Sequence, residues 1–300
     1  MPQTPLKDGE MEINLNLIAV QIFNGIVLGM IYVMLAMGLT IVWGMMDIIN
    51  FSHGFFYTLG AYLAYTLVSA MGNFWLAMIL VPLGTAAIGI LLERVLLRRL
   101  YGLNILYQIL MTFGIALMGR EIIIIIYGPI GKSFFPPQAL EGTFFIGSLF
   151  FPKYRVFLLI LVSLIAGAMY FFIERTKFGS IIRAGTEDKE MVSSLGINIS
   201  LVFLLTFGLA MAIAGLSGVL AAPMRGLNPF MDWNILGICF AVVIIGGMGS
   251  FAGAVFGGLI VGVAQSLVGL LWPSASIIII FVVMSIILLI KPRGLFGVRD

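Results

Sequence analysis

The chain is dominated by apolar runs, most of them long enough to cross a lipid bilayer as a helix, with short polar breaks between them. About 20 apolar residues in helical form span the hydrocarbon core. Only 10% of the residues are charged, whereas a soluble domain carries about a quarter. We therefore predict an all-α polytopic membrane bundle of about 8–10 spans, forming a single domain over residues 1–300. The expected spans are 17–46, 54–70, 74–92, 103–127, 156–173, 201–222, 235–249, 253–271 and 276–291.

Some of these helices are expected to be discontinuous. The first run is long enough for two pieces and could break at Gly38 or Gly44. The segment from Gly246 to Ser250 is short and rich in glycine, and lipid tolerates such breaks only where the backbone is buried in protein or lines a cavity. Gly247 and Gly249 are therefore candidates for a translocation route. The first run is too long for a signal peptide, whose apolar part has roughly 7–15 residues, so we expect it to be retained.

The densest patch of charge, residues 174–199, holds eight charged residues between two apolar runs. If this loop is cytoplasmic, alternation of the spans places ten cations inside and five outside, as the positive-inside rule requires. The N-terminus is then outside and the C-terminus cytoplasmic; splitting the first span would move the N-terminus inside. The ten are Arg94, Arg98, Arg99, Arg175, Lys177, Arg183, Lys189, Lys291, Arg293 and Arg299; the five are Lys7, Lys132, Lys153, Arg155 and Arg225.

The loop has the pattern of an amphipathic helix beginning near Ser180. One face at helical spacing would hold Ile181, Ala184, Met191 and Leu195, interrupted by Asp188. Gly196 follows, where a helix ends readily in the left-handed conformation. An amphipathic helix between two spans could lie on lipid, but the acidic residues Glu187, Asp188 and Glu190 would be repelled by anionic headgroups. A protein partner suits them better.

Three patterns resemble enzyme or metal sites and are better explained otherwise. The sequence G-P-I-G-K-S at 128–133 lacks the first glycine of a phosphate-binding loop. Gly215-Leu-Ser217-Gly218 fits an intramembrane serine protease, but the single histidine, His53, precedes the serine, and the neighbouring small residues favour close helix packing. His53 with one aspartate, Asp47, gives too few convergent ligands to predict a metal site, and the single cysteine, Cys239, cannot form a thiolate site alone.

Polar residues inside the apolar runs are candidates for the route. The stretch Asp47–Gly54 contains Asn50, Ser52 and His53; it could cap the next helix, line the route, or do both. Arg120 and Glu121 lie within a span, where charge is costly, so each needs a partner elsewhere unless Arg120 extends to the membrane surface. Uncharged candidates are Asn24, Gln108 and Gln265, which could equally form hydrogen bonds between helices.

Five short motifs occur in the order found in one known family. The loop carries Phe178-Gly179, Arg183-Ala184, Asp188, Val192 and Gly196-Ile197-Asn198, which resemble the coupling loop of branched-chain amino acid ABC importer permeases. The other four are Phe23-Asn24-Gly25, Ile49–Gly54, Gly246–Ser250 with Gly253-Ala254 and Gly257-Gly258, and Pro292–Gly297. The resemblance covers nearly the whole chain and is closer to the H-type permease than to the M-type.

The resemblance implies a bacterial inner-membrane permease that moves Leu, Ile or Val. A periplasmic binding protein would deliver the substrate, and an M-type permease would pair with this chain. Two ATPase subunits would bind ATP and dock below the two permeases, and the coupling helix that receives their movement would be Glu187–Gly196. It implies no cofactor on this chain, and neither nucleic acid nor any partner beyond these subunits and the bilayer. Related permeases carry urea or short amides, which remains the nearest alternative; the intramembrane protease is a remote one.

Overall fold

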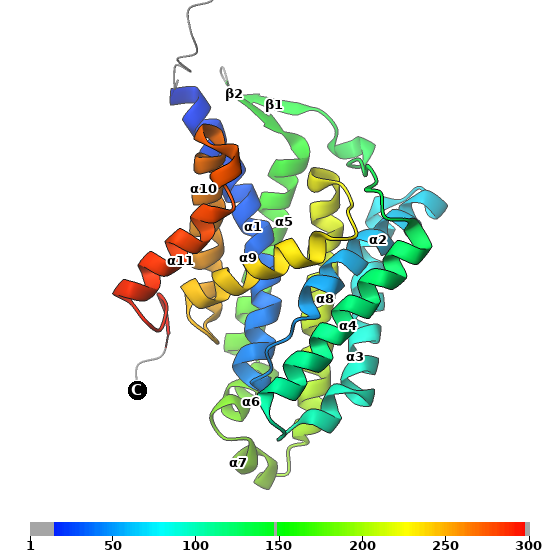
Figure 1. The fold of residues 1–300 in the computed structure, drawn as a ribbon, viewed down its shortest axis with the longest axis vertical. Helices are drawn as coiled ribbons and strands as arrows, with labels where there is room; N and C mark the ends of the chain where they lie inside the picture. Colours follow the sequence, from blue (N-terminus) through cyan, green and yellow to red (C-terminus); the bar gives the residue numbers. More distant parts are fainter. Residues whose placement is uncertain (1–14, 147–148, 298–300) are drawn as a thin grey trace, which may run out of the picture.

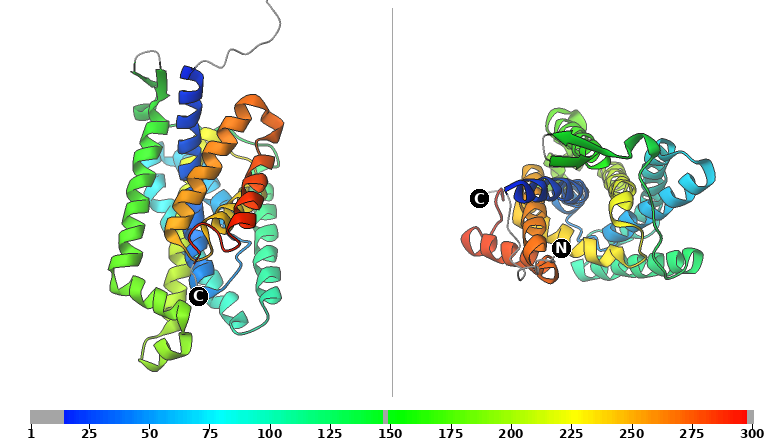
Figure 2. Two further views of the ribbon diagram at one scale, coloured as in Figure 1. Left: turned by 90° about the vertical axis from the view of Figure 1, so that its left-hand side faces the viewer. Right: turned by 90° about the horizontal axis from the view of Figure 1, so that it is seen from above.

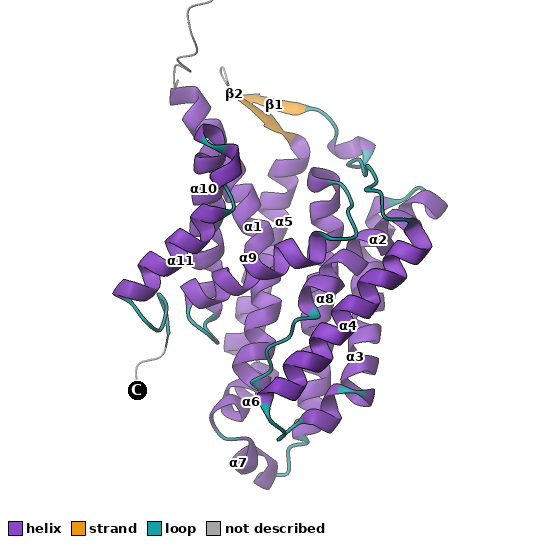
Figure 3. Ribbon diagram, in the orientation of Figure 1, coloured by secondary structure: helices purple, strands orange, loops and turns teal. Residues whose placement is uncertain are grey.

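The computed structural model describes residues 15–146 and 149–297 and is almost entirely helical (Figures 1 and 3). The first helices are α1 (Leu15–Met46), α2 (His53–Met71), α3 (Phe74–Val95) and α4 (Ile105–Tyr127), with the 3₁₀ turn η1 at Leu97–Leu100. A second such turn, η2 (Gln138–Leu140), precedes the strands β1 (Thr143–Ile146) and β2 (Leu149–Pro152), which pair antiparallel with Thr143 opposite Pro152. The remaining helices are α5 (Lys153–Arg175), α6 (Lys177–Glu187), α7 (Lys189–Ser194), α8 (Ile199–Arg225), α9 (Met231–Gly246), α10 (Phe251–Leu271), the turn η3 (Pro273–Ala275) and α11 (Ile278–Ile290).

Each of the nine predicted spans falls on one helix of the structure. Seven of the described helices are long and apolar enough to cross a bilayer, and α9 and α11 are shorter apolar helices. The prediction of a polytopic membrane bundle is confirmed. The first run is a single helix of 32 residues, so neither Gly38 nor Gly44 breaks it.

Helix α1 forms the centre of the bundle, and its second half is almost completely buried. It packs against α10, α8, α5 and α9. Glycines allow the closest of these contacts: a Cβ added to Gly25 would lie 2.7 Å from Val263 Cα, and one added to Gly29 would lie 2.8 Å from the Gly258 carbonyl oxygen. This seam of small residues is the means by which membrane helices approach closely.

Two helices begin inside the bundle instead of at its ends. The segments Asp47–Ser52 and Gly226–Phe230 run back from the preceding helix before α2 and α9 start (Figure 1). The two starts meet, because a Cβ on Gly54 would collide with the Asp232 carbonyl oxygen. Discontinuous helices are therefore present at these two places and at the predicted Gly246–Ser250 break. The connection between the expected spans 201–222 and 235–249 is shorter in the structure, since α8 continues through Pro223 to Arg225 and α9 begins at Met231.

The two ends of the molecule differ. Helices α6 and α7 project from one end, and the β1–β2 hairpin lies at the opposite end, near the start of α1 (Figure 2). The described chain finishes on the α6–α7 side of α11 (Figure 1). This arrangement agrees with the alternation used to assign the cations to two sides.

Candidate functional site

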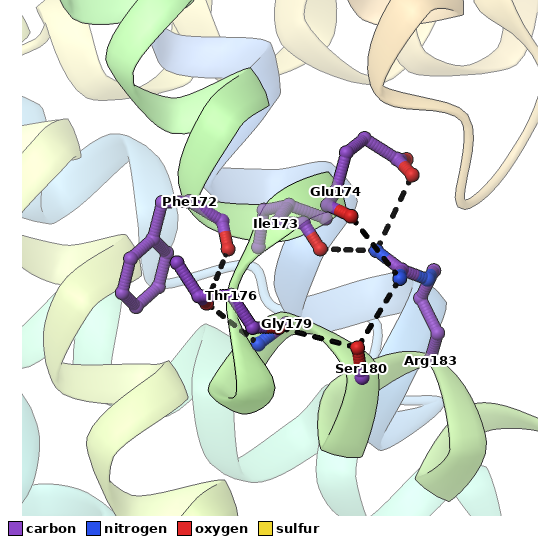
Figure 4. A network of polar contacts seen from close by, with 7 residues as sticks. All are labelled: Phe172, Ile173, Glu174, Thr176, Gly179, Ser180 and Arg183. Atoms are coloured by element: carbon purple, nitrogen blue, oxygen red, sulfur yellow. Dashed lines mark hydrogen bonds and ion pairs between the residues drawn. The ribbon is translucent and has the colours of Figure 1, made fainter.

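The first candidate site is a helical elbow made of α6 and α7, which we call the α6–α7 elbow (residues 176–198). The chain bends at Thr176, whose hydroxyl donates to the Phe172 carbonyl at 2.6 Å and accepts from the Gly179 amide at 3.1 Å (Figure 4). Thr176 therefore closes α5 and caps the start of α6 with one side chain. Such a cap satisfies backbone groups that a helix end leaves free.

Two motif residues hold the elbow against the end of α5. A Cβ on Gly179 would collide with the Ile173 carbonyl oxygen, so the close approach of α6 to α5 needs glycine here. The Arg183 guanidinium donates to the same Ile173 carbonyl and forms an ion pair with Glu174 at 3.3 Å (Figure 4). Gly179 and Arg183 thus set the angle at which the elbow leaves the bundle.

The elbow consists of two helices and not the single helix expected from Ser180 onward. The helix starts at Lys177 and breaks at Asp188, which is extended. The Asp188 carboxylate accepts from the Met191 amide at 2.9 Å and so caps α7. Asp188 interrupts the apolar face because it begins a new helix.

The end of the elbow is closed by two residues of the predicted loop. Gly196 is in the left-handed conformation with φ 81°, as expected for a glycine that ends a helix. Asn198 then caps α8 by accepting from the Leu201 amide at 3.1 Å, while Ile197 is partly buried.

The tip of the elbow presents apolar side chains beside acidic ones. Val192 is buried against the protein, whereas Met191 is 61% exposed and Leu195 is 70% exposed. Asp188, Glu190 and Ala184 are exposed as well, and the side chain of Glu187 lies outside the described part of the structure. Because Met191 and Leu195 are four residues apart, they lie on one side of the α7 segment and form a small exposed apolar surface.

The second candidate site is an ion pair within the bundle that joins α4 to the start of α9. Arg120 Nη2 lies 2.7 Å from Asp232 Oδ2, and Arg120 Nε lies 3.1 Å from both carboxylate oxygens. The Arg120 Cζ atom lies 5.9 Å from the centre of the Phe230 ring, over its face. Arg120 therefore has an internal partner and does not need to reach the membrane surface. Glu121, its neighbour in sequence, is exposed on the outer face of α4.

Polar contacts toward the hairpin end join α1 to α5, α8 and α10. Asn24 accepts a hydrogen bond from Arg155, and Gln265 accepts one from the Tyr32 hydroxyl at 2.5 Å. Arg225 Nη2 in turn donates to the Tyr32 oxygen at 2.7 Å. Two of the uncharged candidates from the sequence thus lie beside arginines that the sequence alone did not link to them.

The candidates at the start of α2 are fully buried. The Asn50 side-chain oxygen accepts from the Ser52 amide at 3.0 Å and from the Ser52 hydroxyl at 2.6 Å. His53 Nε2 lies 3.0 Å from the Leu35 carbonyl oxygen, and its Nδ1 has no partner. Asn50 thus stabilises the turn that starts α2. A role for these residues in the route stays a prediction.

Gln108 lines a pocket of about 410 Å³ at the end of the bundle from which the elbow projects. Its amide nitrogen donates to the Leu100 carbonyl at 3.4 Å, and its amide oxygen has no hydrogen-bond partner. Tyr101 lines the same pocket and donates to Glu93 at 2.6 Å. Burial and this hydrogen bond to Glu93 raise the pKa of Tyr101 above its usual range.

The Gly-rich break and the last motif, far apart in the family pattern, meet in space. Leu295 and Phe296 donate their backbone amides to the Ile245 and Gly246 carbonyls at 2.8 and 2.9 Å. Gly247 and Gly249 have φ of 100° and 77°, a conformation that favours glycine. The closing segment Pro292–Gly297 therefore caps α9, and the two motifs form one structural unit.

The enzyme-like patterns have structural explanations. The Ser217 hydroxyl donates to the Ala214 carbonyl at 3.1 Å, while His53 bonds to Leu35, so the two are not hydrogen-bonded to each other. Gly218 and Gly215 instead allow α8 to contact α2 and α3. Residues 128–133 form an irregular connection in which Lys132 pairs with Leu227. No group of three or more His, Cys, Asp or Glu side chains able to hold a metal occurs among the described residues.

Comparison with known proteins defines the class to which this fold and elbow belong. A family model described as the permease component of branched-chain amino acid transport systems matches residues 21–288. The chain belongs to this family of membrane permeases. No solved structure matches it.

Named relatives extend over nearly the whole chain. The permease protein LivH of Salmonella typhimurium is 30% identical over 92% of this chain and 94% of its own length. BraD of Pseudomonas aeruginosa is 29% identical over 92% and 95%. LivM of Escherichia coli K12 is 29% identical over 89% of this chain but only 68% of its own length. The chain is therefore similar in extent to the LivH and BraD proteins, as the H-type resemblance predicts.

Proposed function

We propose that this chain is the H-type permease subunit of an ATP-driven importer that carries Leu, Ile and Val across the bacterial inner membrane. The observation that supports this most strongly is the α6–α7 elbow. It combines the family's loop motif with an exposed apolar tip, on a chain that matches the family from residue 21 to residue 288. The relatives are named as branched-chain amino acid transport permeases.

The elbow is the proposed docking point for an ATPase subunit. The two ATPase subunits of the importer bind the ATP, and this chain binds neither ATP nor another cofactor. Met191 and Leu195 would enter a groove on the ATPase, and the acidic side chains around them would face its cations. Burying two apolar side chains of this size contributes roughly 3–6 kcal/mol before the costs of association. The break at Asp188 makes α7 a separate short unit that a moving ATPase could displace.

The proposed orientation follows from this assignment. The elbow and the C-terminus face the cytoplasm, and the β1–β2 hairpin faces the periplasm, where a substrate-binding protein delivers the amino acid. An M-type permease, resembling the LivM relative, would complete the pathway. The neutral polar residues on α1, α2 and α10, together with the break at Gly246–Ser250, would offer hydrogen bonds along the route.

Uptake by a strain that lacks its own branched-chain amino acid importers tests the proposal. Cells expressing this chain with its M-type, ATPase and binding-protein partners should accumulate labelled leucine, and excess isoleucine or valine should compete. Leaving out the ATPase subunits should abolish accumulation. Competition by urea or acetamide, with none by isoleucine or valine, would assign the chain to the urea and amide transporters instead.

A further inference from the structure

Four helices bring polar side chains together around Arg225, the last residue of α8. Arg225 Nη2 donates to the Tyr32 hydroxyl of α1 at 2.7 Å, and the guanidinium also lies next to the Tyr57 hydroxyl of α2. Tyr32 donates onward to Gln265 of α10 at 2.5 Å. We call these four residues the Arg225 cluster.

The cluster lies inside the bundle, yet its cation remains accessible. Tyr32 and Tyr57 are each only 1% exposed, whereas Arg225 is exposed. The chain after Arg225 pairs with Lys132 on the hairpin side of the molecule. The guanidinium therefore reaches from accessible space near that end to the buried start of α2.

Arg225 has no carboxylate partner among the described residues. The two ion pairs found there are Arg120–Asp232 and Arg183–Glu174. Asp232, the buried acid of α9, is thus already neutralised by Arg120. A cation within a membrane protein is costly unless a counter-charge or a functional ligand balances it.

The hydrogen bonds within the cluster leave donor groups of Arg225 available to bind an anion. The guanidinium has five N–H donors; the phenol oxygen of Tyr32 accepts from one of them, and the Tyr57 hydroxyl lies beside it. Because the Tyr32 O–H group donates its hydrogen bond to Gln265, the lone pairs of the Tyr32 oxygen are available to accept from Arg225. The remaining N–H groups form the planar fork that binds a carboxylate through two parallel hydrogen bonds.

We propose that Arg225, positioned by Tyr32 and Tyr57, is the carboxylate-recognition site of the translocation route and binds the α-carboxylate of an aliphatic amino acid as it leaves the binding protein. This inference rests on the proposed import function and adds the chemical feature of the substrate that the permease itself selects. Urea and short amides have no carboxylate, so such a site would serve an amino acid importer and not an amide importer.

Chemical rescue of Arg225→Cys in the complete reconstituted importer tests the proposal. Cys239 is the only natural cysteine and is buried, and replacing it by alanine leaves position 225 as the single thiol. Loss of a charge-assisted hydrogen bond should lower ATP-driven leucine uptake roughly tenfold or more. Modification before reconstitution with an aminoethyl methanethiosulfonate should raise uptake to about the level of Arg225→Lys, because the reagent returns the positive charge without the planar fork. A propyl reagent of similar size should not.

Lys132→Cys is the matched control, because it removes a cation on the same side outside the cluster and should keep uptake within about twofold of the parent. Arg225→Lys, which keeps the charge but not the fork, decides the matter if the cysteine variant does not assemble; we expect its uptake to fall at least about fivefold. Parent-level uptake by Arg225→Lys or by unmodified Arg225→Cys, or equal rescue by both reagents, would overturn the proposal. Failure of the parent importer to carry leucine would instead refute the proposed function.

Discussion

Among single residues, the glycine and the arginine of the loop motif contact the same backbone carbonyl group. Gly179 permits α6 to touch the Ile173 carbonyl, and Arg183 donates to that same oxygen. The two residues of the loop motif therefore have a structural role at the base of the elbow. The residues available for contact with a partner lie further along, at Met191 and Leu195.

Replacing Gly179 by alanine should destabilise the elbow, because the added Cβ meets backbone that cannot move aside. We expect a loss of about 1–3 kcal/mol, seen as a lower melting temperature of the purified membrane protein. Gly185→Ala on the same helix is the control, since its Cβ would make only an ordinary contact of 3.7 Å with Ile199. Equal melting temperatures for the two variants would show that the contact at Gly179 is not tight.

Replacing Asp232 by alanine should leave the Arg120 charge unpaired inside the bundle. Breaking a buried ion pair in this way costs about 3–5 kcal/mol, which corresponds to a fall in melting temperature of at least about 5 °C. Asn234→Ala, at an exposed position two residues further on, should change little. The double variant Arg120→Leu with Asp232→Leu should recover much of the loss. Additive losses in the double variant would argue against the pairing.

Residue partners are the part of the structure that sequence reasoning missed. Arg120 was expected either to find a partner or to reach the membrane surface, and nothing in the sequence singled out Asp232, 112 positions away. The same holds for Arg225, which the charge count placed on the outer side without a partner. Such pairs depend on how α4, α8 and α9 pack against their neighbours, and the local sequence pattern of each helix does not contain this information.

At the scale of elements, helix positions could be predicted because the bilayer sets their length. All nine apolar runs became helices, and Asn198, Gly196 and Thr176 end or start helices as their chemistry favours. The breaks were harder to place. Gly38 and Gly44 allow close packing without interrupting α1, since Gly44 contacts Gly249 and Gly38 contacts His53. The break instead follows at Asp47–Ser52, where the buried Asn50 side chain satisfies the turn.

The proposed docking of the ATPase can be tested by substitutions in and next to helix α7. Leu195→Glu should weaken co-purification of the ATPase subunits, because it places a charge in the surface that would be buried. Ser193→Glu adds the same charge to the same short helix at an exposed position away from Met191 and Leu195, and it should keep the ATPase bound. Equal retention of the ATPase by both variants would place the docking surface elsewhere.

Substitutions of Asp188 can distinguish its role as the cap of α7 from the role of its negative charge. Asp188→Asn keeps a side-chain oxygen that can cap α7, whereas Asp188→Lys loses both cap and charge. If the cap matters most, the asparagine variant should couple ATP hydrolysis to uptake normally and the lysine variant should not. If both variants uncouple, the negative charge itself contacts the ATPase.

At the scale of the whole molecule, the arrangement has two distinct ends joined by a central helix. Helix α1 runs through the core and packs against α10 and α8, which contribute Gln265 and Arg225 to the Arg225 cluster near the hairpin end. The α6–α7 elbow leaves the opposite end through α5, which also packs against α1. Movement of the elbow can therefore reach the polar contacts between α1 and α10 through directly packed helices.

The most direct test of this account is site-specific photo-crosslinking of the assembled importer. A benzophenone side chain at Met191 should crosslink to an ATPase subunit, and one at Phe145, in β1 at the opposite end, should not. Crosslinking of the ATPase from Phe145, or from neither position while the importer remains active, would contradict both the proposed orientation and the proposed role of the α6–α7 elbow.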